Sequence, residues 1–451
     1  MPCHNTLLSR NTHLLPLLAA AGVVGVALLI ASPNFRWSPN KGENPYGSDF
    51  LQDWTAANMI ASGQTRHLYN LPQFDAWQHD PERTGFRWAA EAYYPPVYPP
   101  PYYLLVSPLG LLPYRVAAVV WLAAMLGCLV AACIVIECCR RRPLALPVPR
   151  RAMSSGQAAS SRQASGPASV WLAVGVLLFP PVLLSLSMGQ KGPVWLLLWG
   201  ISWGLLHQRR EFAAGLVFGL LSLKPTLFFL FPLLMAYHSR WRFVLAAGLS
   251  WCSLWLAAAA VMPGQVWPEF LQVAAGTGSY SQHAGYQWAW SCTLRSLAQG
   301  LPPLAGSVWW GSLVLSLPAV YVLGCLARPP VAAGHPFDPA EPRFIALAIL
   351  GTCLFSPHFY AYDLMLLLLP IWLLWHTHRG QAVVLIGCVW IGMSVSQLCL
   401  DTAGLSVMPL ALLAAVYCLS AVTPGQSSVR KGVSGNPAPS NILHTGLSAQ
   451  A

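Results

Sequence analysis

The segment FAAGLVFGLLSLKPTLFFLFPLLMAY, residues 212–237, decides the class of fold because it is apolar almost throughout. A run of about 20 apolar residues is long enough to cross a bilayer as a helix. Basic residues flank the segment on both sides: Arg209, Arg210, Arg240 and Arg242. A single span would place one of these arginine pairs outside, against the cytoplasmic preference of Lys and Arg. Lys224–Pro225 at its middle would also interrupt a helix. We therefore predict two short helices that meet near Lys224–Pro225, with both ends on the cytoplasmic side.

The rest of the chain has the same apolar character. Of its 451 residues, 55% are hydrophobic and 9% are charged, whereas about a quarter are charged in a soluble protein. This composition excludes an ordinary soluble enzyme, a disordered chain and a disulfide-rich secreted module. Further apolar runs predict membrane spans over residues 13–32, 116–137, 169–187, 191–206, 241–262, 306–327, 342–357, 361–376, 381–400 and 405–422. The expected fold is an all-α integral membrane protein, a polytopic bundle of about 11–12 transmembrane helices.

The position of the charges predicts the orientation of the bundle. The net charge of +11 comes largely from arginines in the connectors between spans, above all in a linker over residues 138–168. The positive-inside rule makes these connectors cytoplasmic, so the charge is an orientation signal and no nucleic-acid partner is expected. We predict a multi-pass protein of the plasma membrane with both termini cytoplasmic. Residues 1–12 form the cytoplasmic N-terminus, 13–423 a single membrane domain, and 424–451 a disordered tail.

The large first outer loop, residues 33–115, holds half of the 14 acidic residues: Glu43, Asp49, Asp53, Asp75, Asp80, Glu82 and Glu91. Its segment SDFLQDWTAANMIASG, residues 48–63, predicts a short amphipathic helix that ends at Gly63. Asp49 and Asp53 are four residues apart and therefore share a face of that helix. A carboxylate there could act as a general base. The other interpretation makes Asp49 an N-cap, with Gln52 completing a capping box.

A proline-rich run, YYPPVYPPPYYLLVSPLGLLP, follows at residues 93–113. Its prolines exclude a regular helix and predict an irregular segment at the membrane interface. The aromatic and apolar side chains could line a groove for a lipid chain. The run could equally be only a rigid entry into the second span.

Polar residues occur at three further places beside or within apolar runs. Residues 189–191, Gly-Gln-Lys, predict a tight outer turn, Lys224 lies at the predicted helix break, and SPHFYAYD spans residues 356–363. Each has an ordinary explanation: Lys224 could snorkel to the headgroups, His358 could be an interfacial histidine, and Asp363 could be an N-cap. Together they offer a cation, an imidazole and a carboxylate, which suits a lipid-phosphate substrate on the outer face.

These motifs, in this order, resemble the integral-membrane glycosyltransferases of family 87. The resemblance covers about residues 10–420 and is carried by Asp49–Phe50, Trp54, Ala56, Ala57, Gly63, Leu68–Tyr69, Tyr94-Pro95-Pro96, Leu104, Pro108, Leu112–Pro113, Gly189–Gln190, Gly215, Gly219, Lys224–Pro225, Ser356–Pro357 and Tyr362–Asp363. It implies a type-C glycosyltransferase fold with the active site at the outer surface. It also implies a hexosyltransferase that moves mannose from a polyprenyl-phosphate donor to a glycolipid or glycan acceptor.

By the same resemblance, Asp49 occupies the place of the family's catalytic acid and would be the general base of an inverting transfer, with Asp53 as the second candidate. Lys224 would pair with the leaving phosphate and His358 would add a phosphate or sugar contact. Substrate contacts are also expected from Gln190, Tyr362 and Asp363. No cofactor beyond the lipid-linked donor is implied, and metal dependence stays open because the sequence has no clear metal-ligand motif.

A different class of function is a lipid or sugar transporter, or a flippase, without transferase activity. Broken helices and polar groups at membrane depth are also features of transporters. The sequence has no evident two-fold repeat, which argues against this alternative. Convergence of Asp49, Lys224 and His358 on one site would favour the enzyme.

Overall fold

A computed structural model describes residues 47–88, 93–141, 175–176, 178–276, 291–300, 318–325, 337–356, 358–403 and 406–421. Within these ranges the fold is helical, and the β-structure is limited to an isolated bridge between Ser291 and Tyr360. The span predicted over 13–32, both termini and most of the 138–168 linker lie outside the described residues.

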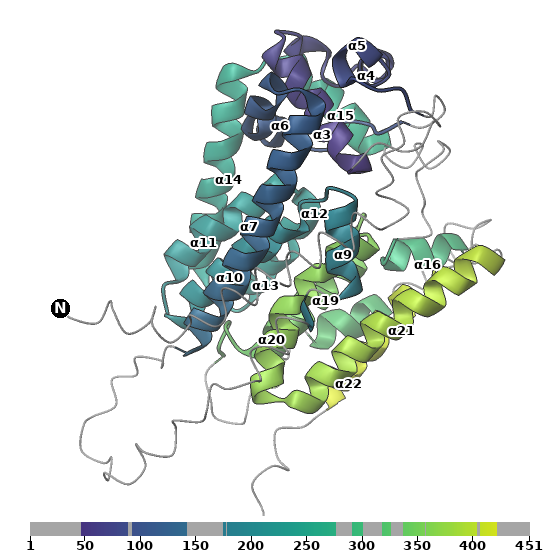
Figure 1. The fold of residues 1–451 in the computed structure, drawn as a ribbon. Coiled ribbons are helices and arrows are strands. Elements are labelled where there is room, and N and C mark those ends of the chain that lie inside the picture. The colour runs from purple at the N-terminus through teal and green to yellow at the C-terminus, as the bar shows by residue number, and fades with distance from the viewer. Residues whose placement is uncertain are drawn as a thin grey trace, which may run out of the picture.

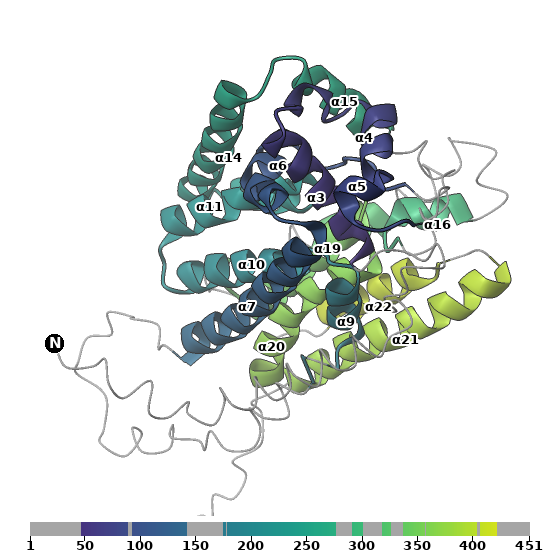
Figure 2. The same cartoon turned by 45° about the horizontal axis from the view of Figure 1, so that its top comes forward.

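The helices of the first loop gather at one end of the molecule (Figure 1; Figure 2). They are α3 (Ser48–Ala61), η2 (Thr65–His67), α4 (Leu71–Gln78), α5 (Pro81–Thr84), α6 (Pro100–Val106) and η3 (Ser107–Leu111), joined there by α15 (Val266–Gly276). Helix α3 packs closely on η3, where a Cβ on Gly110 would lie 2.2 Å from the backbone of Ala57. Asn58 Nδ2 donates a hydrogen bond to the Gly110 carbonyl oxygen at 2.9 Å. This contact fixes the helix that carries both candidate carboxylates.

The proline-rich run is less irregular than predicted. Residues 93–99 are not helical, but α6 begins at Pro100, with Pro100 and Pro101 in its first turn. Proline is tolerated there because the first-turn N–H groups have no partner within the helix. The expectation of an irregular segment was therefore wrong for residues 100–106.

Three helices of the described part of the chain are long and apolar enough to cross a membrane: α7 (Tyr114–Arg141), α14 (Trp241–Val261) and α21 (Arg379–Ala403). Shorter helices complete the bundle: α9 (Pro180–Ser187), α10 (Gly192–His207), α16 (Leu294–Gly300), α19 (Pro342–Phe355), α20 (Leu368–Thr377) and α22 (Met408–Ala421). The segment predicted as a span over 361–376 begins as a 3-10 helix, η7 (Ala361–Leu367), before α20. The length and apolar composition of these helices are those expected in a membrane protein.

The segment from residue 211 to 237 is broken as predicted. It consists of α11 (Glu211–Gly219), η4 (Leu220–Leu223), α12 (Pro225–Phe228) and α13 (Leu230–Tyr237). Lys224, between η4 and α12, has φ −126° and ψ 86°, which is not helical. Arg240 Nη1 lies 2.9 Å from Glu211 Oε1, so an ion pair joins the two ends of the segment. The chain therefore turns back near Lys224, and the two ends of this segment lie next to each other.

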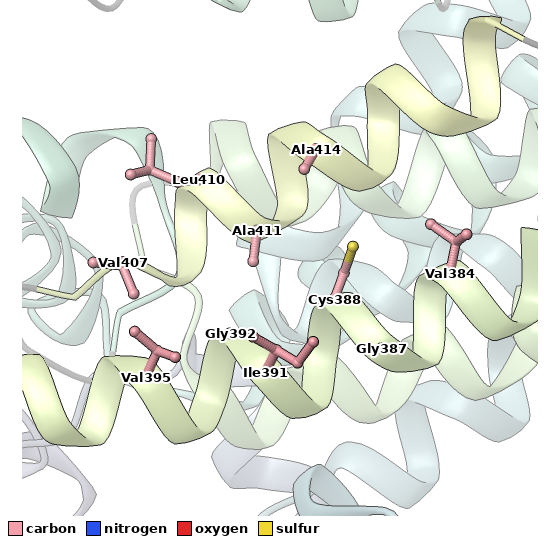
Figure 3. Close-up of a pocket in the computed structure, with 10 residues that line it drawn as sticks. All are labelled: Val384, Gly387, Cys388, Ile391, Gly392, Val395, Val407, Leu410, Ala411 and Ala414. Atoms are coloured by element: carbon pink, nitrogen blue, oxygen red, sulfur yellow. The ribbon is translucent and has the colours of Figure 1, made fainter.

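An apolar groove of about 560 Å³ lies between α21 and α22. Figure 3 shows its lining, which includes Cys388 and Ile391 of α21 and Leu410 of α22. The predicted site residues are absent from its lining.

Candidate functional site

The site begins at the first turn of α3. Gly47 is the N-cap and has a left-handed backbone with φ 63°, while the Asp49 carboxylate lies in the first turn and makes no capping bond. Gln52 Nε2 donates to the Tyr103 hydroxyl at 2.7 Å. The capping-box interpretation of Asp49 and Gln52 is therefore wrong. Instead, the half-buried Asp49 accepts a hydrogen bond from Gln190 Nε2.

The two carboxylates of α3 face one tight turn, which connects α9 to α10. Gln190 of this turn contacts Asp49, and Lys191 Nζ lies 2.8 Å from Asp53 Oδ2. The Lys191 and Asp53 side chains are 1% and 0% exposed, so this ion pair is fully buried. The prediction that Asp49 and Asp53 share a helix face is confirmed.

Tyrosines of the proline-rich run surround the Lys191 ammonium. Its nitrogen lies 4.0 Å from the centre of the Tyr98 ring and 5.5 Å from that of Tyr102. Both distances suit cation–π attraction, which is strongest where water is excluded. The Tyr98 carbonyl accepts a hydrogen bond from the Tyr69 hydroxyl at 2.6 Å, which fixes the backbone of the proline-rich run beside Lys191.

A second buried ion pair lies near Asp49. Lys224 Nζ is 2.5 Å from Asp363 Oδ1, and the two residues are 8% and 1% exposed. Asp363 Oδ2 also accepts from the Tyr360 backbone N–H at 3.4 Å, and the ring of Tyr362 lies 5.7 Å from the ammonium. Tyr360 is the N-cap of η7. Snorkelling of Lys224 is therefore wrong. Asp363 is not the N-cap residue itself, but it is the third residue of a capping box at the start of η7, so its predicted capping role is confirmed in part.

Charge and burial act in opposite directions on the two carboxylates of α3. Burial raises the pKa of Asp49, while the charge of Lys191, the hydrogen bond from Gln190 and the charge of Lys224 lower it. Burial likewise raises the pKa of Asp53 to about 6, against the charge of Lys191. Both lysines therefore lie close enough to Asp49 to favour its ionised form.

His358 lies in the turn between α19 and η7. Its backbone is held by Ser356, whose hydroxyl donates to the His358 carbonyl at 2.9 Å. Burial, together with the charges of Arg295 and Lys224, lowers the pKa of His358 to about 4. The imidazole is thus neutral at physiological pH and shares its surroundings with Lys224.

The structure brings together all of the predicted site residues, in two groups around Asp49. Asp53 and Gln190 belong to the first group, and Lys224, Tyr362, Asp363 and His358 to the second. The site also includes Lys191, Tyr98 and Tyr102, which were not predicted as site residues. A lysine next to Gln190 at the start of an apolar run was the available signal for Lys191. Among the described residues, no cluster of three or more His, Cys, Asp and Glu side chains could hold a metal ion.

Replacement of Gly189 should disrupt this arrangement. Gly189 has φ 64°, and an added Cβ would lie 2.8 Å from the Cβ of Phe50 in α3. We expect Gly189→Ala to lower stability by about 2 kcal/mol, because alanine is strained in this conformation and the contact forces the turn away from α3. Thermal unfolding in detergent measures this effect. The control is Gly127→Ala in α7, where an added Cβ meets nothing within 4 Å; an equal loss in both variants would contradict the expectation.

Comparison with known proteins identifies the family of this chain. A sequence profile of glycosyltransferase family 87 matches residues 97–357, which is more than half of the 451 residues. The matched region contains Gln190, Lys191 and Lys224 and begins after Asp49 and Asp53. No curated protein and no solved structure matches the chain. The chain belongs to glycosyltransferase family 87 and is a membrane glycosyltransferase.

Proposed function

We propose that this glycosyltransferase moves a hexose, mannose, from a polyprenyl-phosphate donor to a glycolipid or glycan acceptor. The observation that carries the proposal is a half-buried carboxylate, Asp49, close to two buried lysines, Lys191 and Lys224. Transfer from a sugar phosphate requires a base for the acceptor hydroxyl, which Asp49 supplies, and a cation for the leaving phosphate, which Lys224 supplies.

Asp49 acts as the general base. It takes the proton of an acceptor hydroxyl while that oxygen attacks the anomeric carbon of the donor. The bond from that carbon to the phosphate oxygen breaks, and the polyprenyl phosphate leaves with the electron pair. Attack opposite to the leaving group inverts the anomeric centre, so a β-linked donor gives an α-linked product. The hydrogen bond from Gln190 orients the Asp49 carboxylate for this step.

The second ion pair serves the leaving group. Lys224 stabilises the negative charge that develops on the phosphate, which takes the place of Asp363 as its partner. The neutral His358 donates a hydrogen bond to a phosphate or sugar oxygen. The Tyr362 ring, which lies next to the Lys224 ammonium, contributes to the surroundings of the leaving phosphate.

The two arginines at the C-terminal end of α7 support an active site on the outer face. Helix α7 leads from the end of the molecule that holds α3 to Arg140 and Arg141 at the opposite end (Figure 1). Arginines favour the cytoplasmic side. The site therefore belongs on the extracytoplasmic face of the plasma membrane, with both termini cytoplasmic.

A donor comparison tests the proposed function. Purified protein in proteoliposomes is given labelled polyprenyl-phosphate mannose and a glycolipid fraction as acceptor, with polyprenyl-phosphate glucose and nucleotide-linked mannose in parallel. We expect label to enter the acceptor from polyprenyl-phosphate mannose alone. A transporter or flippase would instead move the donor across the bilayer and leave it chemically intact, and that result would overturn the proposal.

A further inference from the structure

We propose that Asp53 is a positioning residue that holds Lys191 beside Asp49, and that Lys191 is the cation that keeps this base ionised. The inference rests on the proposed function of Asp49. It assigns different tasks to the two carboxylates that the sequence leaves as rival bases.

The accessibility of the two carboxylates separates their tasks. A general base must come within hydrogen-bonding reach of the proton that it removes. The Asp53 side chain, one helical turn after Asp49, is 0% exposed, whereas Asp49 is half-buried. An acceptor hydroxyl can therefore reach Asp49 and not Asp53.

The register between α3 and the α9–α10 turn couples the two residues. Gln190 and Lys191 are adjacent, and they contact carboxylates one helical turn apart, Asp49 and Asp53. The turn itself is fixed to α7, because Trp121 Nε1 donates to the Gly189 carbonyl at 2.7 Å. Fixing Lys191 on Asp53 thereby also fixes Gln190 on Asp49.

A fully buried ammonium group needs an opposite charge nearby to offset the cost of removing it from water. Asp53 supplies that counter-ion, and the rings of Tyr98 and Tyr102 add cation–π attraction. The charge of Lys191 is then the largest influence that opposes the rise in the pKa of Asp49 on burial. Among the described residues, the electrostatic environment of Asp49 also includes Lys224, Asp363, Asp53, Tyr98 and Tyr362.

Carboxyl labelling without substrate tests the inference. The apolar reagent dicyclohexylcarbodiimide modifies protonated carboxyl groups, and mass spectrometry of the α3 peptide locates the modification. Proteoliposomes of wild type, Lys191→Arg and Asp53→Asn/Lys191→Met are labelled across a pH series. The Lys191 charge favours ionised Asp49, so its removal raises the pKa of Asp49. We expect the labelling midpoint of Asp49 to rise by about one pH unit in the double variant and to stay in place in Lys191→Arg. An unchanged midpoint in the double variant would overturn the inference.

The single variant Asp53→Asn tests the positioning role. It leaves Lys191 without the carboxylate that holds it beside Asp49, so the labelling midpoint of Asp49 should rise, as in the double variant. A midpoint that stays or falls, which is what the loss of one negative charge alone would give, would show that Asp53 does not position Lys191. Since labelling needs no sugar transfer, this result is independent of whether the proposed donor is correct.

The pH profile of kcat/KM gives a second readout, which separates positioning from a merely structural role. In Asp53→Asn/Lys191→Met, the low-pH (acid) limb of this profile should move to higher pH by the same amount as the labelling midpoint of Asp49. Sugar transfer should be retained at pH values above that limb. Complete loss of transfer at every pH, in protein that unfolds at the wild-type temperature, would make Asp53 or Lys191 a direct participant. A lower unfolding temperature with an unmoved acid limb would leave the pair only a structural role, against the inference.

Discussion

Asp49→Asn should lower the transfer rate by about a thousandfold, the middle of the range for a lost general base. Asparagine has nearly the same shape as aspartate and can still accept the hydrogen bond that Gln190 Nε2 donates. It cannot take up the proton of an acceptor hydroxyl. The loss should therefore appear in kcat, with little change in the binding of the donor or in stability. Initial rates of sugar transfer measured above the acid limb give the effect.

The matched control for this variant is Glu82→Gln, which removes a carboxylate from the exposed helix α5 of the same loop. We expect its rate to stay within about twofold of wild type, since exposed charges far from a site contribute little. Equal rates in Asp49→Asn and Glu82→Gln would remove Asp49 from the role of base.

Lys224→Met should have the second largest effect, because it acts on both stability and chemistry. It leaves the Asp363 carboxylate, which is 1% exposed, without its ion-pair partner. Breaking a buried ion pair on one side costs about 3–5 kcal/mol. It also removes the cation next to the leaving phosphate, which should lower the transfer rate about a hundredfold or more.

A double variant separates these two contributions. Lys224→Met/Asp363→Asn removes both charges, so the unfolding temperature should return close to that of wild type while transfer stays low. Lys224→Arg keeps the positive charge and should retain more transfer activity than Lys224→Met or the double variant. Thermal unfolding and initial rates are measured on the same preparations. Recovery of transfer in the double variant would show that Lys224 has only a structural role.

Local patterns in the sequence predicted the local features of this site. The arginines on both sides of residues 212–237, together with Lys224–Pro225, predicted a broken segment, and the ion pair between Glu211 and Arg240 confirms that the chain turns back. Spacing predicted the helix over 48–63 and the shared face of Asp49 and Asp53. These features depend on residues that are close in the chain.

The pairings across the site depend on tertiary packing. Gln190 lies 141 positions after Asp49, and Asp363 lies 139 positions after Lys224. No local pattern predicts which lysine pairs with which carboxylate, and for that reason the role of Lys191 was not predicted. The N-cap interpretation of Asp49 failed because Gly47 takes that position with a left-handed backbone. The expected total of about 11–12 spans remains a prediction.

The central claim is that Asp49 is the base of a sugar transfer from a polyprenyl phosphate. The most direct measurement is the initial rate at which purified protein moves labelled mannose from polyprenyl-phosphate mannose to a glycolipid acceptor, in wild type, Asp49→Asn and Asp53→Asn/Lys191→Met at high pH. The account predicts transfer by wild type and by the double variant, and a loss of about a thousandfold in Asp49→Asn. Wild-type rates in Asp49→Asn would contradict it.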